Sequence, residues 1–150
     1  MGIVRDFYGI VKSEKGTNLM ATMAAPKPRP DLEAHRKAAA TEFPQLVGAL
    51  VSIIGRKLTA YVASIKDARA IDRWLHNTTP HKDVERRLRL TYHVAATLAQ
   101  FDAPDVVQAW LIGLNPELDD QVPISLLRNG DIEADGKRVL NAARAFVAGG

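Results

Sequence analysis

The stretch from residue 106 to residue 131 constrains the fold most, because it reads as two short helices joined by a polar turn. Apolar side chains recur at its start at the spacing of one helix face, namely Val106, Val107, Trp110, Leu111 and Leu114. Asn115 ends this helix, because a residue before proline is pushed out of helical backbone. Pro123 favours the start of a second helix, which Gly130 is expected to end in a left-handed conformation. This pattern predicts a helical fold.

The same helical periodicity runs through the rest of the chain. Residues 44–54 repeat apolar side chains up to Gly55, which predicts a core helix. Residues 58–75 are expected to form two short helices around a turn at Ser64 to Lys66. Asp83 is expected to cap a long helix. The apolar face of that helix carries Val84, Leu88, Leu90, Thr91, Val94, Ala95, Leu98 and Phe101. With a last helix over residues 134–148, the sequence predicts an all-α protein.

The N-terminal part reads as a region outside the main fold. Residues 24–30 (AAPKPRP) are typical of a proline-stiffened linker. Asp31 is expected to cap a short alanine-rich helix that ends near Ala40 and lies on the surface. We therefore divide the chain into an N-terminal extension with its linker (residues 1–42), a helix-turn-helix domain (residues 43–82), and a connecting helix with a small C-terminal helical domain (residues 83–150).

Composition removes several classes of function. The chain has no cysteine, which excludes disulfides, thiol catalysis and cysteine-ligated metals. Its four histidines form no i, i+4 pair, and the sequence has no phosphate-binding loop, nucleophile elbow or dinucleotide-binding glycine pattern. We therefore expect no enzymatic activity, no metal and no cofactor. Since no apolar run approaches the length of a membrane helix and the first residues lack the form of a signal peptide, we expect a cytoplasmic protein with no membrane partner.

Charge is segregated along the chain. Residues 56–93 hold nine Lys or Arg against four acids, whereas residues 101–136 hold one arginine against eight acids. A basic surface attracts a polyanion, while an acidic region is repelled by DNA and left free for a protein. The sequence therefore predicts two partners on different parts of the chain. Between these regions, Arg86, Arg87 and Arg89 are expected either to touch phosphates or to pair with the acidic residues.

The segment from residue 58 to residue 75 has the shape of a helix-turn-helix, with Ile71 and Trp74 holding the second helix down. The candidate DNA-binding residues fall on the outer face of that helix: Lys66, Arg69, Arg73 and His76. The alternative interpretation is a helical hairpin with a solvated basic face. It stays open because Ser64 stands where most such turns have Gly, and because the second half is one residue longer than usual.

The second half of the chain carries a sequence motif made of Trp110-Leu111, Leu114-Asn115-Pro116, Leu118, Pro123, Leu126-Leu127 and Gly130. This motif resembles the C-terminal toxin-binding domain of the Xre/MbcA/ParS antitoxins. The resemblance runs from about Arg56 to Gly150. It implies an Xre-like helix-turn-helix domain followed by a small toxin-binding domain. It also implies an antitoxin that neutralises a RES-domain toxin and represses its own operon by binding operator DNA, so that any NAD chemistry belongs to the toxin. The alternatives are a freestanding helix-turn-helix regulator without a toxin, and a helical scaffold that does not contact DNA.

The last helix supplies the candidate residues for a protein partner. Val139, Leu140 and Ala143 can fill the core, whereas Phe146 and Val147 continue the apolar stripe toward the end of the chain. The candidate partner-binding residues are Arg138, Asn141, Arg144, Phe146, Val147 and Gly150. In the alternative interpretation Phe146 folds back onto Trp110, which together with Trp74 is expected to anchor the core. A homodimer, or a larger hetero-oligomer with the toxin, is expected because one small recognition helix offers few contacts to DNA.

Overall fold

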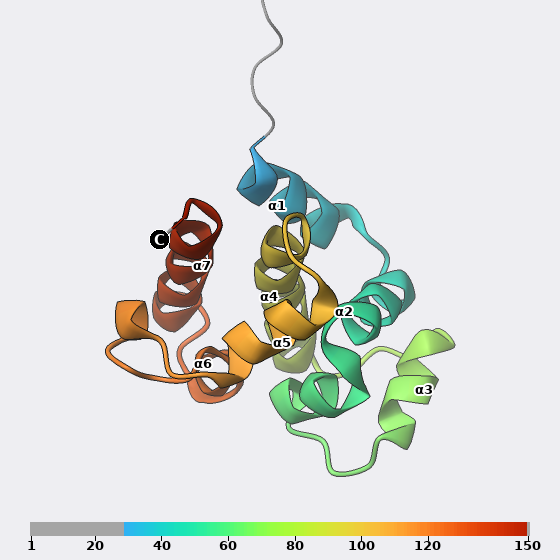
Figure 1. Cartoon of the computed structure of the whole chain (residues 1–150). Helices are drawn as coiled ribbons and strands as arrows, with labels where there is room; N and C mark the ends of the chain where they lie inside the picture. The colour runs from blue at the N-terminus through green and yellow to red at the C-terminus, as the bar shows by residue number, and fades with distance from the viewer. Residues whose placement is uncertain (1–28, 150) are drawn as a thin grey trace, which may run out of the picture.

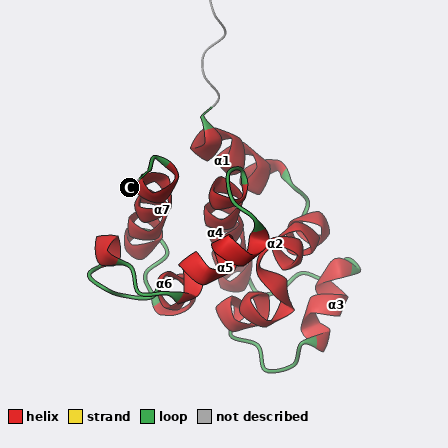
Figure 2. Ribbon diagram, in the orientation of Figure 1, coloured by secondary structure: helices red, strands yellow, loops and turns green. Residues whose placement is uncertain are grey.

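The computed structural model describes residues 29–149, and in that range the chain forms seven α-helices and one 3-10 turn (Figure 1, Figure 2). The elements are α1 (Pro30–Ala40), α2 (Phe43–Ala63), α3 (Arg69–Leu75), α4 (Lys82–Ala99), α5 (Pro104–Ile112), η3 (Pro116–Leu118), α6 (Pro123–Asn129) and α7 (Ala134–Val147). Within these residues the only β feature is a single bridge between Asn115 and Gln121. The all-α prediction is confirmed. The expectations for residues 1–28 and for Gly150 lie outside the described range.

Helix α4 lies at the centre of the molecule, with α1, α2 and α7 packed along it (Figure 1). The predicted stripe of Leu88, Thr91, Ala95 and Leu98 is buried. Every residue from Thr91 to Leu98 is buried, because neighbouring helices cover all sides of this half of the helix. Phe101 was expected to widen the apolar face. It lies instead beyond the last helical residue and is 60% exposed.

Helix α2 is bent at Gly55, where the backbone angles are φ 84° and ψ 163°. The predicted end of the first core helix at Gly55 is therefore confirmed, although the second segment follows without a loop. Two carbonyl groups next to the bend accept hydrogen bonds from side chains. The carbonyl oxygen of Ile53 accepts a hydrogen bond of 2.9 Å from Nε2 of Gln108, and that of Gly55 accepts one of 2.8 Å from the buried hydroxyl of Thr59.

By length and composition alone α2 is apolar enough to cross a membrane, with a mean hydropathy of 1.5 over its most apolar window. This differs from the expectation that no apolar run approaches that span, and no other helix in residues 29–149 meets the same description. In the fold, the apolar side chains Leu46, Leu50 and Ile54 of α2 are buried in the core. Helix α2 packs most closely on α4, so part of its apolar surface is covered within the fold.

Arginines on α4 hold the C-terminal ends of two other helices. The last carbonyl groups of a helix have no partner inside it and need an external donor. Arg87 donates to the carbonyl oxygens of Leu127 and Gly130 at the end of α6, at 3.0 and 2.9 Å. Arg89 does the same at the end of α1, with Ala38 and Thr41 at 2.8 and 2.9 Å. These two arginines therefore have a structural role that neither of the two expectations, phosphate contact or pairing with the acidic region, included.

The third of these arginines, Arg86, pairs with Glu133 of the acidic region at 3.1 Å. This is the ion pair that the sequence suggested for at least one of the α4 arginines. Both side chains are largely exposed, so the pair contributes little to stability.

Helix α1 packs onto α4 more closely than a surface helix was expected to. Ala34 and Ala38 are buried there, and they belong to the same apolar core as α2 to α7. Asp31 does not cap α1, whose first residues receive no side-chain hydrogen bond, and it pairs instead with Arg144 of α7 at 3.3 Å. Residues 30–40, which we had grouped with the N-terminal extension, are thus part of one continuous core with the rest.

Two predicted helix boundaries have other causes than expected. The cap of α4 is His81, whose Nδ1 accepts a hydrogen bond from the backbone of Asp83 at 3.4 Å. Gly130 ends α6 in extended backbone (φ −77°) and not in the left-handed region. A glycine is required at position 130, because a Cβ there would lie 2.6 Å from both the carbonyl oxygen of Leu126 and the carboxylate of Asp135.

Candidate functional site

A tight turn connects α2 to α3. Ser64 adopts the left-handed conformation (φ 57°, ψ 35°) that glycine usually fills, and its backbone N–H donates to the carbonyl oxygen of Tyr61 at 3.1 Å. Lys66 lies in the turn, which agrees with the turn predicted at Ser64 to Lys66. Because α3 begins only at Arg69, Lys66 is not on the outer face of this helix, where the candidate DNA-binding residues were expected. The cause is Asp67, whose carboxylate accepts the backbone N–H of Arg69 at 3.0 Å and so favours the turn over a longer helix.

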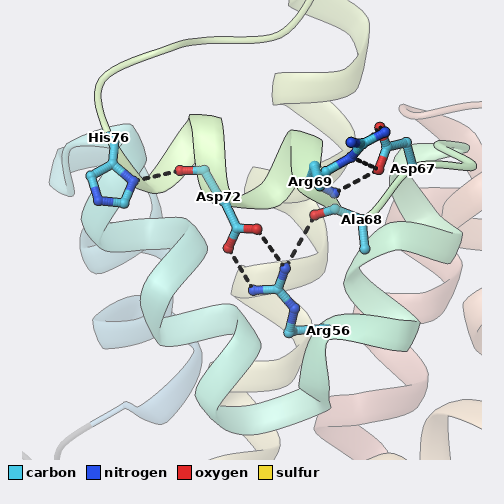
Figure 3. Close-up of polar contacts among 6 residues, drawn as sticks. All are labelled: Arg56, Asp67, Ala68, Arg69, Asp72 and His76. Atoms are coloured by element: carbon cyan, nitrogen blue, oxygen red, sulfur yellow. Dashed lines mark hydrogen bonds and ion pairs between the residues drawn. The ribbon is translucent and has the colours of Figure 1, made fainter.

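Helix α3 is fixed on one side by apolar packing and on the other by an arginine. Ile71 and Trp74 are buried as predicted, and the Trp74 ring meets Phe43 edge-on at 6.1 Å between ring centres. Arg56 of α2 donates to both carboxylate oxygens of Asp72, at 3.0 and 3.2 Å, and to the carbonyl oxygen of Ala68 (Figure 3). The short helix is thereby held in one orientation against α2.

The four candidate DNA-binding residues are all exposed, and they differ in how free their side chains are. Arg69 is held by Asp67, with its Nε 3.0 Å from the carboxylate (Figure 3). This hydrogen bond lowers the pKa of Asp67 below 3.8 and raises that of Arg69. His76 lies just past the end of α3, and its Nδ1 is 2.7 Å from the carbonyl oxygen of Asp72. Within residues 29–149, no carboxylate pairs with Lys66 or Arg73, which are the cations most available to a ligand.

A second candidate site is an apolar groove of about 410 Å³ between α5 and α7. It is lined by Ala109, Trp110, Gly113, Leu114, Asn115, Pro116, Glu117, Ala142, Ala145 and Phe146. Trp110 and Phe146 meet edge-on at 6.3 Å between ring centres. Leu114 is 73% exposed and Phe146 is 41% exposed. Trp74 anchors the core as predicted, but Trp110 is half-buried at the edge of this groove.

Among the candidate partner-binding residues, Arg138 and Arg144 already make contacts within the chain. Arg138 pairs with Asp119 and Asp135 at 3.0 and 3.1 Å, and the hydrogen bond from the backbone of Asp131, followed by that from Arg138, lowers the pKa of Asp135. Arg144 donates to Oδ1 of Asn141 at 3.0 Å.

The end of α7 presents its apolar residues differently. Val147 is half-buried. Phe146 folds back onto Trp110, as in the alternative interpretation, yet it still lines the groove and exposes part of its ring. At the described end of α7, the surface open to a partner is therefore mainly aromatic, because the arginines of this helix already make contacts within the chain.

Sequence reasoning missed Leu114 and Pro116 as surface residues. The spacing placed Leu114 on the buried face of the first helix, but α5 ends at Ile112 because Gly113 is extended (φ −87°, ψ 162°). The chain therefore leaves the helix before Leu114, whose side chain emerges on the rim of the groove. The glycine at position 113 was the signal that the helical spacing should not be continued.

Two histidines lie together between α1 and α4. The rings of His35 and His93 are 5.2 Å apart, and Nε2 of His93 lies 3.2 Å from the carbonyl oxygen of Asp31. Burial lowers the pKa of His93 below 6.5. Across residues 29–149, no three His, Cys, Asp or Glu side chains are grouped closely enough to hold a metal ion.

Comparison of the chain with models of protein families, with curated proteins and with solved structures gave no match.

Proposed function

We propose that this protein is an antitoxin that binds and neutralises a RES-domain toxin and represses its own operon through DNA. The observation that carries the proposal is the apolar groove between α5 and α7. Ala109, Trp110 and residues 113–117 line one side of it, and they belong to the stretch whose sequence resembles the toxin-binding domain. Leu114 stands 73% exposed on its rim, which is costly in water and favourable in a protein interface.

The arrangement around α3 supports the DNA-binding part of the proposal. A short helix follows a tight turn, its buried face is fixed by Ile71 and Trp74, and its outer face carries Arg69 and Arg73. Arginine is the residue that most often reads guanine and contacts phosphate. Substituting Arg73 with Ala should weaken binding to the cognate operator, with little effect on the fold because this side chain is exposed.

The second candidate function is a freestanding transcriptional regulator with the same α3 face and no toxin partner. Both functions need DNA binding, so they differ only in whether the groove has a protein ligand. A scaffold without DNA contact would use neither Arg69 nor Arg73. Co-expression with the protein encoded by the neighbouring reading frame separates the three.

The experiment tests whether the groove neutralises a toxin. The tagged protein is co-expressed with its neighbour, and growth and co-purification are measured for the parent and for Leu114→Asp. Because Leu114 is exposed, the Asp variant should keep its helical circular dichroism while it loses the partner and the protection. The matched control is Phe101→Ser, which removes another exposed apolar side chain outside the groove and should protect like the parent. Full protection by Leu114→Asp would refute the groove as the toxin-binding site.

A further inference from the structure

A hollow of about 500 Å³ lies between the second half of α2, the turn before α3, and α6. We call it the basic hollow. Its lining residues are Arg56, Lys57, Ala60, Tyr61, Ile65, Lys66, Ala68 and Arg128. Four of these eight residues are cations and none is a carboxylate, so the electrostatic potential in the hollow favours an anion.

The four cations are held to different degrees. Arg56 is already bound to Asp72 and to the carbonyl oxygen of Ala68. Lys57 and Lys66 are exposed, and no carboxylate in residues 29–149 pairs with either. Arg128 is half-buried, with its guanidinium carbon 4.5 Å above the centre of the Tyr61 ring. Arg128 is therefore positioned in advance, whereas the two lysines can adjust to a ligand.

The position of Arg128 is unexpected for its part of the sequence. It is the one basic residue among eight acids in residues 101–136, where ion pairs would be easy to form. In the fold it instead lies in a hollow with three other cations. Like charges that line one hollow repel each other, and a bound anion offsets that repulsion. The arrangement suits a ligand that brings negative charge to the hollow.

The hollow adjoins the segment that leads into the proposed DNA-reading helix. Lys66 and Ala68 line it, and Arg69, the first residue of α3, follows directly. A helix that reads bases needs phosphate contacts beside it to fix its orientation on the duplex. A sugar-phosphate backbone therefore fits both the charge of the hollow and its place next to α3 better than an acidic polypeptide does.

We propose that the basic hollow binds the DNA backbone beside the segment contacted by α3, with Lys57, Lys66 and Arg128 as its phosphate contacts. This inference rests on the proposed DNA binding and deepens it. It assigns a role in DNA binding to α6, a helix of the region that was otherwise expected to face a protein. Such contacts carry no sequence information and act on any duplex.

The test measures the affinity of the full chain for a fluorescent mixed-sequence duplex of about 30 base pairs, long enough for two half-sites, over a range of salt concentrations. Each lost phosphate contact removes about 0.9 from the slope of log K against log salt, which is on the order of an eightfold loss in affinity near 0.1 M salt. Arg128→Gln and Lys57→Gln should each show this change. Arg128→Lys keeps the charge and should recover most of it. Arg36→Gln removes an equal charge from the exposed side of α1 and should bind like the parent.

The outcomes separate this inference from the proposed function. If the parent binds no duplex, the DNA-binding function fails and the inference falls with it. If the parent binds and Arg73→Ala weakens it, but Arg128→Gln and Lys57→Gln match Arg36→Gln, the inference alone is overturned. If polyglutamate displaces the duplex from the parent at equal charge concentration, but not from Arg128→Gln, the hollow belongs to an acidic protein and the inference is also overturned. Since Lys57 is exposed, its variant tests the inference even if loss of the Arg128–Tyr61 contact destabilises the fold.

Discussion

Arg86 and Arg87 are neighbours in sequence, but their surroundings give them different roles. Arg86 lies in solvent with Glu133, while Arg87 is half-buried and donates to two carbonyl oxygens that have no other external donor among the described residues. Removing a donor from buried acceptors leaves them without hydrogen bonds, which costs far more than losing an exposed ion pair. Residue type alone does not distinguish these roles, so the same roles were expected of both arginines from the sequence.

We expect Arg87→Ala to lower the free energy of unfolding by about 2 kcal/mol, since two charge-assisted hydrogen bonds at the end of α6 are lost. The control Arg86→Ala should lower it by no more than about 1 kcal/mol. Urea unfolding followed by circular dichroism measures both values. Equal losses in the two variants would contradict the structural role of Arg87.

His93 makes stability depend on pH. Burial, with help from the nearby charges of His35 and Arg144, lowers its folded pKa below the 6.5 of the unfolded chain, so the unfolded state takes up a proton first as pH falls. Stability from this residue is complete above about pH 6.5 and is lost below it, at no more than about 1.4 kcal/mol per pH unit. His93→Gln keeps a donor for the carbonyl oxygen of Asp31 and cannot titrate. Urea unfolding between pH 5 and 8 should show a shallower slope for this variant, and identical slopes would exclude the effect.

At the scale of elements, apolar spacing predicted most of the helices because helical burial requires that spacing. Residues 44–54, the stripe on α4, the pair of helices around Asn115, and α7 all follow from it. The start of α3 could not be read the same way. Lys66 and Asp67 fit a helix by propensity, but the backbone N–H of Arg69 donates a hydrogen bond to the carboxylate of Asp67 and stabilises a turn there. Local polar competition of this kind leaves no periodic signal.

The bend in α2 leads to a prediction with an internal control. Gly55 lies in a backbone region that only glycine adopts without strain, so Gly55→Ala should lower the free energy of unfolding by about 1–3 kcal/mol. Gly48 lies inside the same helix, and a Cβ there would meet Leu75 at an ordinary 3.7 Å. Gly48→Ala should therefore raise the free energy of unfolding by about 0.5–1 kcal/mol. Thermal unfolding that shifts in the same direction for both variants would contradict this assignment.

At the scale of the whole molecule, the candidate sites depend on contacts between distant parts of the chain. The groove joins Trp110 of α5 to Phe146 of α7, and the basic hollow joins Lys57 of α2 to Arg128 of α6. The sequence indicated an aromatic end and a separation of charge, since both are properties of composition. It did not indicate which helices meet, because that depends on how all of them pack around α4.

We expect the protein to bind DNA as a dimer or larger assembly. Helix α3 has only seven residues, and one such helix offers fewer contacts than specific binding to an operator needs. Sedimentation velocity at micromolar concentration, with a duplex of the region upstream of the reading frame, should show at least two chains on each DNA molecule. A single chain on each duplex would contradict this expectation.

At position 55, an ordinary residue is excluded by the chirality of its Cα and not by the size of its side chain. A Cβ of the natural hand would meet nothing within 4 Å, so crowding does not exclude a side chain there, and only the backbone angles do. Those angles are the mirror image of ones that ordinary residues adopt freely. A chain made by chemical ligation with D-alanine at position 55 should therefore avoid the backbone strain that L-alanine introduces, and should be the more stable of the two by urea unfolding. The two proteins would have the same atoms and the same bonds, and they would differ only in the chirality of one carbon.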